Sequence, residues 1–150
     1  MKNIITLLLV LVLSVSLVAC GGSEATSVAK ARDLPEGDYT ELGDGTVYIA
    51  TAGGTSENGN VPVIYAEKDL ILKQIGLNAW DFNGGALSFI YVDGMLIDKA
   101  QLANTQMSLD LQGEQLSVGL HSVEVVQYEN DDPASAMTAY KSMQYEIKAA

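Results

Sequence analysis

The sequence has very little of the chemistry on which most catalytic and metal-binding sites depend. It contains one cysteine and one histidine among 150 residues, so it has no intrachain disulfide and no cysteine-ligated metal cluster. A single histidine also excludes zinc sites built from several histidines. Basic residues are scarce, since 8 Lys and Arg stand against 19 Asp and Glu, a formal net charge of −11. Nucleic-acid binding needs a basic surface, so this balance argues against a nucleic-acid partner.

Long apolar runs are absent except at the N-terminus. Residues 4–19 are apolar apart from three hydroxyl side chains, and Lys2 precedes them. The run is shorter than the roughly 20 residues that span a bilayer comfortably, and it has the length and the cationic start of a secretory signal. We therefore expect residues 1–19 to be a signal peptide.

The end of this segment carries the most specific motif in the chain. Leu17, Val18, Ala19 and Cys20 follow one another there. They resemble the lipobox of bacterial lipoproteins, in which a leucine, a small or branched residue and a glycine or alanine precede the cysteine. The resemblance implies cleavage before Cys20, attachment of diacylglycerol to its thiol and acylation of the new N-terminus. It therefore implies an extracytoplasmic protein that is lipid-anchored to the bacterial cell membrane.

The polypeptide itself is not expected to bind the membrane. Without Lys2, seven basic residues face 19 acidic ones, which gives the mature protein a formal net charge of −12. An anionic bilayer repels such a domain, so attachment depends on the acyl chains, each buried methylene of which contributes about 0.8 kcal/mol. Residues 20–35 are mostly small and polar and predict a flexible tether. About 15 stretched residues reach some 50 Å.

Residues 36–150 are predicted to form one all-β domain. Runs of β-branched and aromatic residues recur between glycine, asparagine and aspartate, which is typical of strands joined by turns. There is no long amphipathic helix and no internal repeat. The predicted strands are 46–52, 61–66, 70–81, 87–92, 95–98, 106–111, 120–128 and 138–148.

Two local patterns support this prediction. In residues 107–112, apolar and polar side chains alternate, so one face lies in a core and the other in water. Residues 87–92 are apolar on both faces, as expected for a central strand. Asp93-Gly94 follows them and predicts a type I′ hairpin turn, because both residues readily adopt positive φ.

The C-terminal part of the domain resembles bacterial immunoglobulin-like domains. The pattern consists of Gly119, His121, Val123 and Val125 within residues 116–129, a polar loop, a closing strand over 140–148, and the hairpin at 91–94. The resemblance implies an immunoglobulin-like β-sandwich of about seven to eight strands. The cysteine pair of antibody domains is missing, so other all-β sandwiches stay open as alternatives.

His121 is the only imidazole that can serve as a base. Nucleophilic catalysis needs a serine or threonine against the base and a carboxylate behind it, and no Gly-x-Ser-x-Gly elbow is present. A pair of catalytic carboxylates needs a cleft that small two-sheet modules seldom enclose. We expect His121 to be structural and the chain not to be an enzyme, with a small hydrolase as an open alternative.

Two acidic turns form a candidate calcium site. They are expected at the same end of the sandwich, where their oxygen atoms can converge, and Ca²⁺ takes six to eight oxygen ligands in flexible geometry. The alternative is a pair of solvated turns in an acidic protein. No other cofactor is expected. The candidate ligands are Asp81, Asn83, Glu129, Asp131 and Asp132.

The aromatic residues and one loop are candidates for recognition. Trp80 is the only tryptophan and is expected to pack in the core, whereas an exposed indole would favour carbohydrate binding. The glycine-rich residues 53–60 lack the lysine and helix of a phosphate-binding loop and are expected to form a mobile recognition surface.

These observations lead to two functional hypotheses. The first is a non-enzymatic interaction or accessory module of the cell envelope, with an envelope protein or glycan as partner. The second is an extracytoplasmic protein that binds a carbohydrate or Ca²⁺ through the loop end of the sandwich. An unpaired edge strand or an exposed apolar patch favours the first hypothesis. A concave pocket with converging polar groups favours the second.

Overall fold

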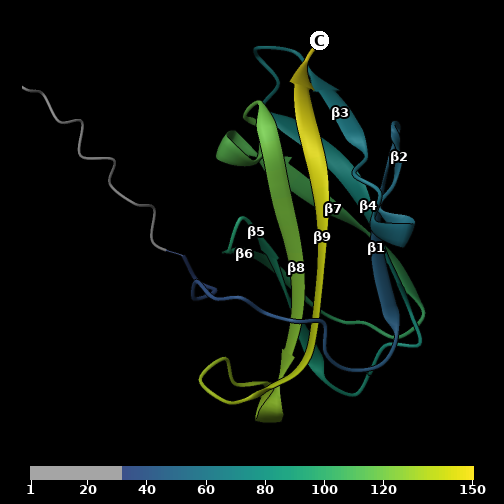
Figure 1. The fold of residues 1–150 in the computed structure, drawn as a ribbon, viewed down its shortest axis with the longest axis vertical. Helices are drawn as coiled ribbons and strands as arrows, with labels where there is room; N and C mark the ends of the chain where they lie inside the picture. Colours follow the sequence, from purple (N-terminus) through teal and green to yellow (C-terminus); the bar gives the residue numbers. More distant parts are fainter. Residues whose placement is uncertain (1–31) are drawn as a thin grey trace, which may run out of the picture.

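Two stacked β-sheets make up residues 32–150, the part of the chain that the computed structural model describes (Figure 1). One sheet has four strands in the order β2-β1-β4-β7, and the other has five in the order β3-β9-β8-β5-β6. Neighbouring strands are antiparallel except β3 and β9, which are parallel. The strands are β1 (Thr46–Thr51), β2 (Gly54–Thr55), β3 (Val63–Ala66), β4 (Leu72–Trp80), β5 (Leu87–Val92), β6 (Met95–Gln101), β7 (Thr105–Gln112), β8 (Gly119–Tyr128) and β9 (Met137–Ala149).

The all-β prediction is confirmed. All eight predicted strands are present, with each end within three residues of its predicted position. The two-residue strand β2 was not predicted, because residues 53–60 have the composition of a turn. Three short 3₁₀ turns, η1 (Glu57–Gly59), η2 (Gly113–Leu116) and η3 (Glu129–Asp131), complete the described structure. Among these residues there is no helix that is both long and apolar enough to cross a bilayer.

The main core lies between the sheets and follows the alternation of the strands. Leu109 and Leu111 of β7 face this core, while Ser108 and Asp110 face away from it, as predicted. Strand β5 is buried on both faces. Its Ile90 belongs to the main core, whereas Phe89 and Tyr91 belong to a second cluster on the other face of the five-stranded sheet.

The N-terminal segment covers this second cluster. Leu34 is only 1% exposed and packs there with Tyr140 of β9. The backbone N–H groups of Asp33 and Leu34 both donate to the Gly94 carbonyl oxygen at 2.9 Å. We call residues 32–34 the N-terminal strap. The C-terminal end of the predicted tether, residues 20–35, is therefore packed against the sheet. The sequence does not predict this packing, because one isolated leucine has no periodic pattern around it.

The hairpin between β5 and β6 has the predicted geometry. Asp93 and Gly94 have φ values of 51° and 73°, as a type I′ turn requires. The predicted signal peptide, Cys20 and the greater part of the predicted tether lie in residues 1–31, outside the described residues. The lipid anchor therefore stays a prediction.

Candidate ligand-binding site

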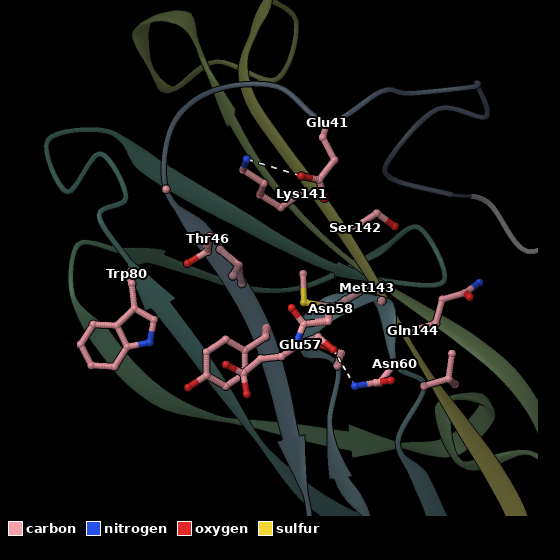
Figure 2. Close-up of a pocket in the computed structure, with 16 residues that line it drawn as sticks. Glu41, Thr46, Glu57, Asn58, Asn60, Trp80, Lys141, Ser142, Met143 and Gln144 are labelled. Atoms are coloured by element: carbon pink, nitrogen blue, oxygen red, sulfur yellow. Dashed lines mark hydrogen bonds and ion pairs between the residues drawn. The ribbon is translucent and has the colours of Figure 1, made fainter.

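A cavity of about 560 Å³ opens on the side of the sandwich where β1 of one sheet approaches β9 of the other (Figure 2). Residues 45–48 and the loop of residues 56–61 line it from the first sheet, and residues 141–144 of β9 line it from the second. Glu41 and Trp80 complete the lining. Its volume falls within the roughly 300–1,000 Å³ that ligand-binding pockets occupy.

Two aromatic side chains lie side by side on the β1–β4 half of this cavity. In the register of the two strands, Trp80 pairs with Thr46 and Tyr48 pairs with Asn78. Trp80 and Tyr48 are therefore diagonal neighbours on one face of the sheet, within reach of each other. Both line the cavity, and Trp80 is 41% exposed. They form a platform on which a flat ligand can stack.

The expectation that Trp80 packs in the core is wrong. Leu77 and Ala79 are fully buried in the core between the sheets. Successive side chains of a strand point to opposite faces, so residue 80 at the end of β4 points outward. The apolar alternation of Ile75, Leu77 and Ala79 was the signal in the sequence that could have placed the indole correctly.

The loop of residues 56–61 forms a polar wall with a defined conformation. Ser56 bonds β1 twice, since its Oγ accepts from the Ile49 N–H and its own N–H donates to the Ile49 carbonyl oxygen, both at 2.9 Å. The Asn60 amide donates to the Glu57 carbonyl oxygen at 2.7 Å. Two hydrogen bonds thus join this loop to β1, and its mobility stays a prediction. It presents Glu57, Asn58 and Asn60 to the cavity.

The opposite wall contains the only cation among the lining residues. The ammonium group of Lys141 donates to the Gly43 carbonyl oxygen at 3.0 Å and lies 3.6 Å from a carboxylate oxygen of Glu41. Lys141 is 9% exposed. Its charge is therefore already satisfied by the chain, whereas the Glu41 carboxylate is largely open to solvent.

Unpaired backbone groups of β9 also face the cavity. Tyr140 exchanges both backbone hydrogen bonds with Leu42, and the Glu146 N–H donates to the Pro62 carbonyl oxygen. Both residues therefore direct their backbone groups away from β8. Alternate residues of a strand point the same way, so Ser142 and Gln144 do so too. Within residues 32–150, no hydrogen bond reaches these N–H and C=O groups from the side of the cavity.

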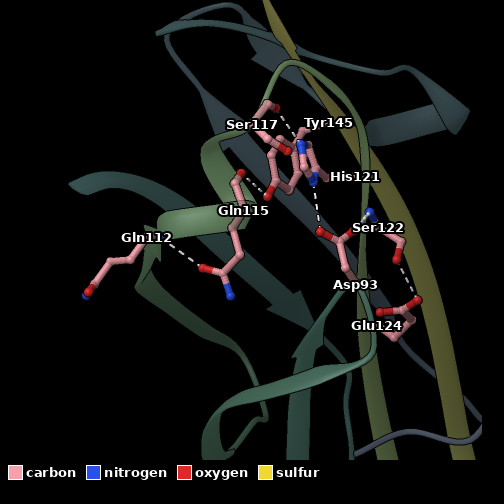
Figure 3. A network of polar contacts seen from close by, with 8 residues as sticks. All are labelled: Asp93, Gln112, Gln115, Ser117, His121, Ser122, Glu124 and Tyr145. Atoms are coloured by element: carbon pink, nitrogen blue, oxygen red, sulfur yellow. Dashed lines mark hydrogen bonds and ion pairs between the residues drawn. The ribbon is translucent and has the colours of Figure 1, made fainter. Parts of the chain in front are cut away.

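His121 of β8 is buried beside Tyr145 of the main core, and both of its ring nitrogens have partners (Figure 3). Its Nδ1 lies 2.7 Å from an Asp93 carboxylate oxygen, and its Nε2 lies 2.8 Å from the Ser117 carbonyl oxygen. The ring stacks on Tyr145, with centroids 5.0 Å apart and planes at 17°. Burial raises the pKa of the Tyr145 phenol, whose hydroxyl donates to the Gln115 carbonyl oxygen. These contacts are of the kind that a structural histidine makes, and the structural role of His121 stays a prediction.

Glu124 is a buried carboxylate close to this network (Figure 3). Its Oε1 accepts a hydrogen bond from the Ser122 hydroxyl at 2.7 Å, while its Oε2 has no partner among the described residues. Burial raises the pKa of Glu124, although the Ser122 hydrogen bond and the positive charge of Arg32 act in the other direction. No pattern in the sequence distinguishes this group, because a lone glutamate within a strand is usually exposed.

The two acidic turns lie at the same end of the sandwich, as predicted. The buried Gln127 amide donates to the Asn83 carbonyl oxygen at 2.8 Å, and an Asp131 carboxylate oxygen accepts from the Leu87 N–H at 2.7 Å. The Asn83 side-chain oxygen accepts from the Gly85 N–H at 3.0 Å. The side-chain oxygens of Asn83 and Asp131 thus already accept hydrogen bonds from nearby backbone N–H groups.

The remaining candidate calcium ligands lie in or beside these turns. The backbone of Asp81 bonds the Asn104 side chain of another loop, and an Asp132 carboxylate oxygen accepts from the Ala134 N–H. Glu129 belongs to the turn η3. No three His, Cys, Asp or Glu side chains within residues 32–150 gather in the way a metal site needs. Calcium binding stays a prediction, which a thermal melt with and without millimolar Ca²⁺ tests.

Comparisons with protein-family models, curated proteins and solved structures found nothing that matches this chain. The function is therefore argued from the cavity itself.

Proposed function

We propose that this chain is a lipid-anchored, non-enzymatic carbohydrate-binding module of the bacterial cell envelope, built on an immunoglobulin-like β-sandwich. The observation that carries the proposal is the exposed Trp80 beside Tyr48 at a cavity with polar walls. Of the two functional hypotheses, the cavity favours ligand binding. It lies on the side of the sandwich between β1 and β9 rather than at the loop end.

The composition of the cavity fits the two sides of a sugar ring. One face of a pyranose carries C–H groups that stack on an aromatic ring, and its rim carries hydroxyl groups that both donate and accept. Trp80 supplies a surface for the apolar face. Glu57, Asn58 and Asn60 supply acceptors and donors for the rim. Because a buried polar group is costly to leave unpaired, such walls select ligands rich in hydroxyl or amide groups.

The charges of the cavity favour a ligand without negative charge. Lys141 is held by Gly43 and Glu41, so it is not free to pair with a phosphate or a carboxylate. The carboxylates of Glu41 and Glu57 repel an anion. A neutral glycan avoids this repulsion.

The immunoglobulin-like topology is supported by the antiparallel pair β8–β9 and the tight hairpin β5–β6, which occupy the residues that carry the resemblance. A lipid anchor and a tether would hold such a module within reach of the glycans that surround a bacterial membrane.

A glycan array with the purified chain, followed by titration calorimetry on each glycan that binds, tests the proposal. Replacing Trp80 by Ala should weaken binding by about tenfold, the equivalent of one stacking contact. Tyr65→Ala is the matched control, because Tyr65 is 66% exposed but lies outside the cavity lining. Absence of glycan binding, or equal losses in the two variants, would contradict the proposal.

A protein partner is the second candidate function. Within residues 32–150, strand β7 pairs only with β4, so its other edge has no partner there. Ile71 and Val118 are 84% and 71% exposed. Open edges and exposed apolar side chains are features of protein-binding surfaces. Crosslinking of the anchored protein on intact cells tests this candidate, and recovery of no neighbouring protein would count against it.

A further inference from the structure

We propose that the ligand is a glycan of at least two sugar units, one stacked on Trp80 and the next presenting an N-acyl amide to the open edge of β9. This inference rests on the proposed carbohydrate-binding function. It adds the chemical class of the sugar and the protein groups that recognise it.

The length of the ligand follows from the layout of the cavity. Trp80 lies at the end of β4. Strand β4 pairs with one edge of β1, and β9 lies beyond the other edge of β1. A ligand that reaches from Trp80 to Gln144 must therefore cross two strand-to-strand gaps, of which the hydrogen-bonded one alone is about 4.8 Å. Figure 2 shows Trp80 and Gln144 on opposite sides of β1. One sugar ring cannot contact both.

The amide follows from the backbone of β9. Between the Leu42–Tyr140 bridge and the Pro62–Glu146 bond, this edge presents the N–H and C=O groups of Ser142 and Gln144. A strand edge is a pattern of alternating donors and acceptors that pairs with amides. An N-acylated amino sugar carries such an amide on its ring, and its N–H and C=O can bond the edge as a peptide unit would.

The cavity lies between two pairings that already fill the rest of this edge. Leu42 occupies it at Tyr140, and β3 occupies it from Glu146 onward. The open stretch thus offers the backbone groups of two residues, Ser142 and Gln144. That length suits a single amide group better than a peptide strand, which would need to displace one of the flanking pairings.

The test compares two trisaccharides with the same linkage, one of N-acetylglucosamine and one of glucose, by titration calorimetry on the full chain purified in detergent. The two ligands differ only at C2 of each ring, which carries an acetamido group in the first and a hydroxyl group in the second. We expect the acetylated trimer to bind about tenfold more tightly, since one buried amide hydrogen-bond pair is at stake. We also expect it to bind more tightly than the free monosaccharide, which cannot reach Trp80 and β9 together.

The backbone contact has its own variant. Ser142→Pro removes the N–H that faces the cavity, and proline is tolerated where a strand's N–H points away from its partner. This variant should lose the preference for the acetylated trimer, whereas Ser142→Ala, which keeps the N–H, should retain it. Where Ser142→Pro fails to fold, amide hydrogen exchange of the unmodified protein serves instead. The acetylated trimer should slow exchange at Ser142 and Gln144.

The outcomes separate the two proposals. Absence of binding by both trisaccharides and by every glycan of the array overturns the carbohydrate-binding function itself. Binding of another glycan on the array with no binding of either trisaccharide overturns the amide contact and leaves that function standing. Equal affinity for both trimers, or unchanged exchange at Gln144 with the acetylated trimer bound, overturns the amide contact and leaves that function standing. Equal affinity for monosaccharide and trimer overturns the two-unit site.

Discussion

The carboxylate of Asp93 ties the β5–β6 hairpin turn to His121 of β8, with 2.7 Å between its oxygen and Nδ1. The second carboxylate oxygen accepts from the Ser122 N–H at 3.0 Å. Asp93→Ala removes both contacts and places alanine at a positive φ, so we expect the free energy of unfolding to fall by about 1–3 kcal/mol. Asp93→Asn keeps the turn preference and one acceptor and should lose less. Urea denaturation measures both, and an Asp93→Ala variant as stable as the natural protein would contradict the role of these two contacts.

Glu124 should make stability depend on pH. Because its pKa is raised in the folded state, the native protein holds this proton to a higher pH than the unfolded chain does. The resulting stabilisation is complete below the unfolded pKa and is lost as the pH rises through the folded pKa. Glu124→Gln should therefore lose less stability than the natural protein between acidic and neutral pH. Urea denaturation across this range measures the difference, and the exposed Glu114→Gln should leave the profile unchanged.

Leu34 should anchor the N-terminal strap to the sheet. Its side chain is buried against Tyr140, so Leu34→Ala should lower the free energy of unfolding by about 2–5 kcal/mol. Leu42→Ala is the matched control. Leu42 also precedes β1, but its side chain is 46% exposed and it contacts β9 through its backbone. Equal effects in the two variants would show that the strap does not depend on this packing.

Gly53 should tolerate no side chain. A Cβ atom at this position would overlap the Val63 carbonyl oxygen, so Gly53→Ala must push β3 away from the β1–β2 turn. We expect a loss of about 1–3 kcal/mol, measured by thermal denaturation. In Gly76→Ala the nearest atom would stand at 3.5 Å, an ordinary contact, and stability should hold or rise slightly. A stable Gly53→Ala would mean that the turn can move freely.

The strands were predictable from local pattern, and the exceptions have physical causes. Residues 107–112 alternate cleanly because one face of β7 is buried, and β5 is apolar on both faces because Leu34 and its neighbours cover its outer side. The packed strap itself was missed, since a single leucine among small residues has no period. Aromatic character alone does not place Trp80, which points outward because it has the opposite strand parity to the buried Leu77 and Ala79.

The cavity could not be predicted from the sequence, because it has no local signature. Its walls come from residues 45–48 and 141–144. These two segments are nearly 100 residues apart in the sequence and meet only when both sheets have formed. The open edge of β9 is equally non-local, since it depends on where Leu42 and β3 stop pairing. Its ligand-facing groups belong to the backbone, which every residue carries.

The position of β9 also determines when this protein can fold. Val63 of β3 pairs with Glu146 of β9, 83 residues later in the chain, and β3 has no other strand neighbour among the described residues. The larger sheet therefore cannot close until residues 137–149 are available. Domains dominated by such distant pairings fold in milliseconds to seconds. Residues 32–136 alone therefore lack the strand that joins β3 to β8, and β3 stays outside the sheet until β9 is in place.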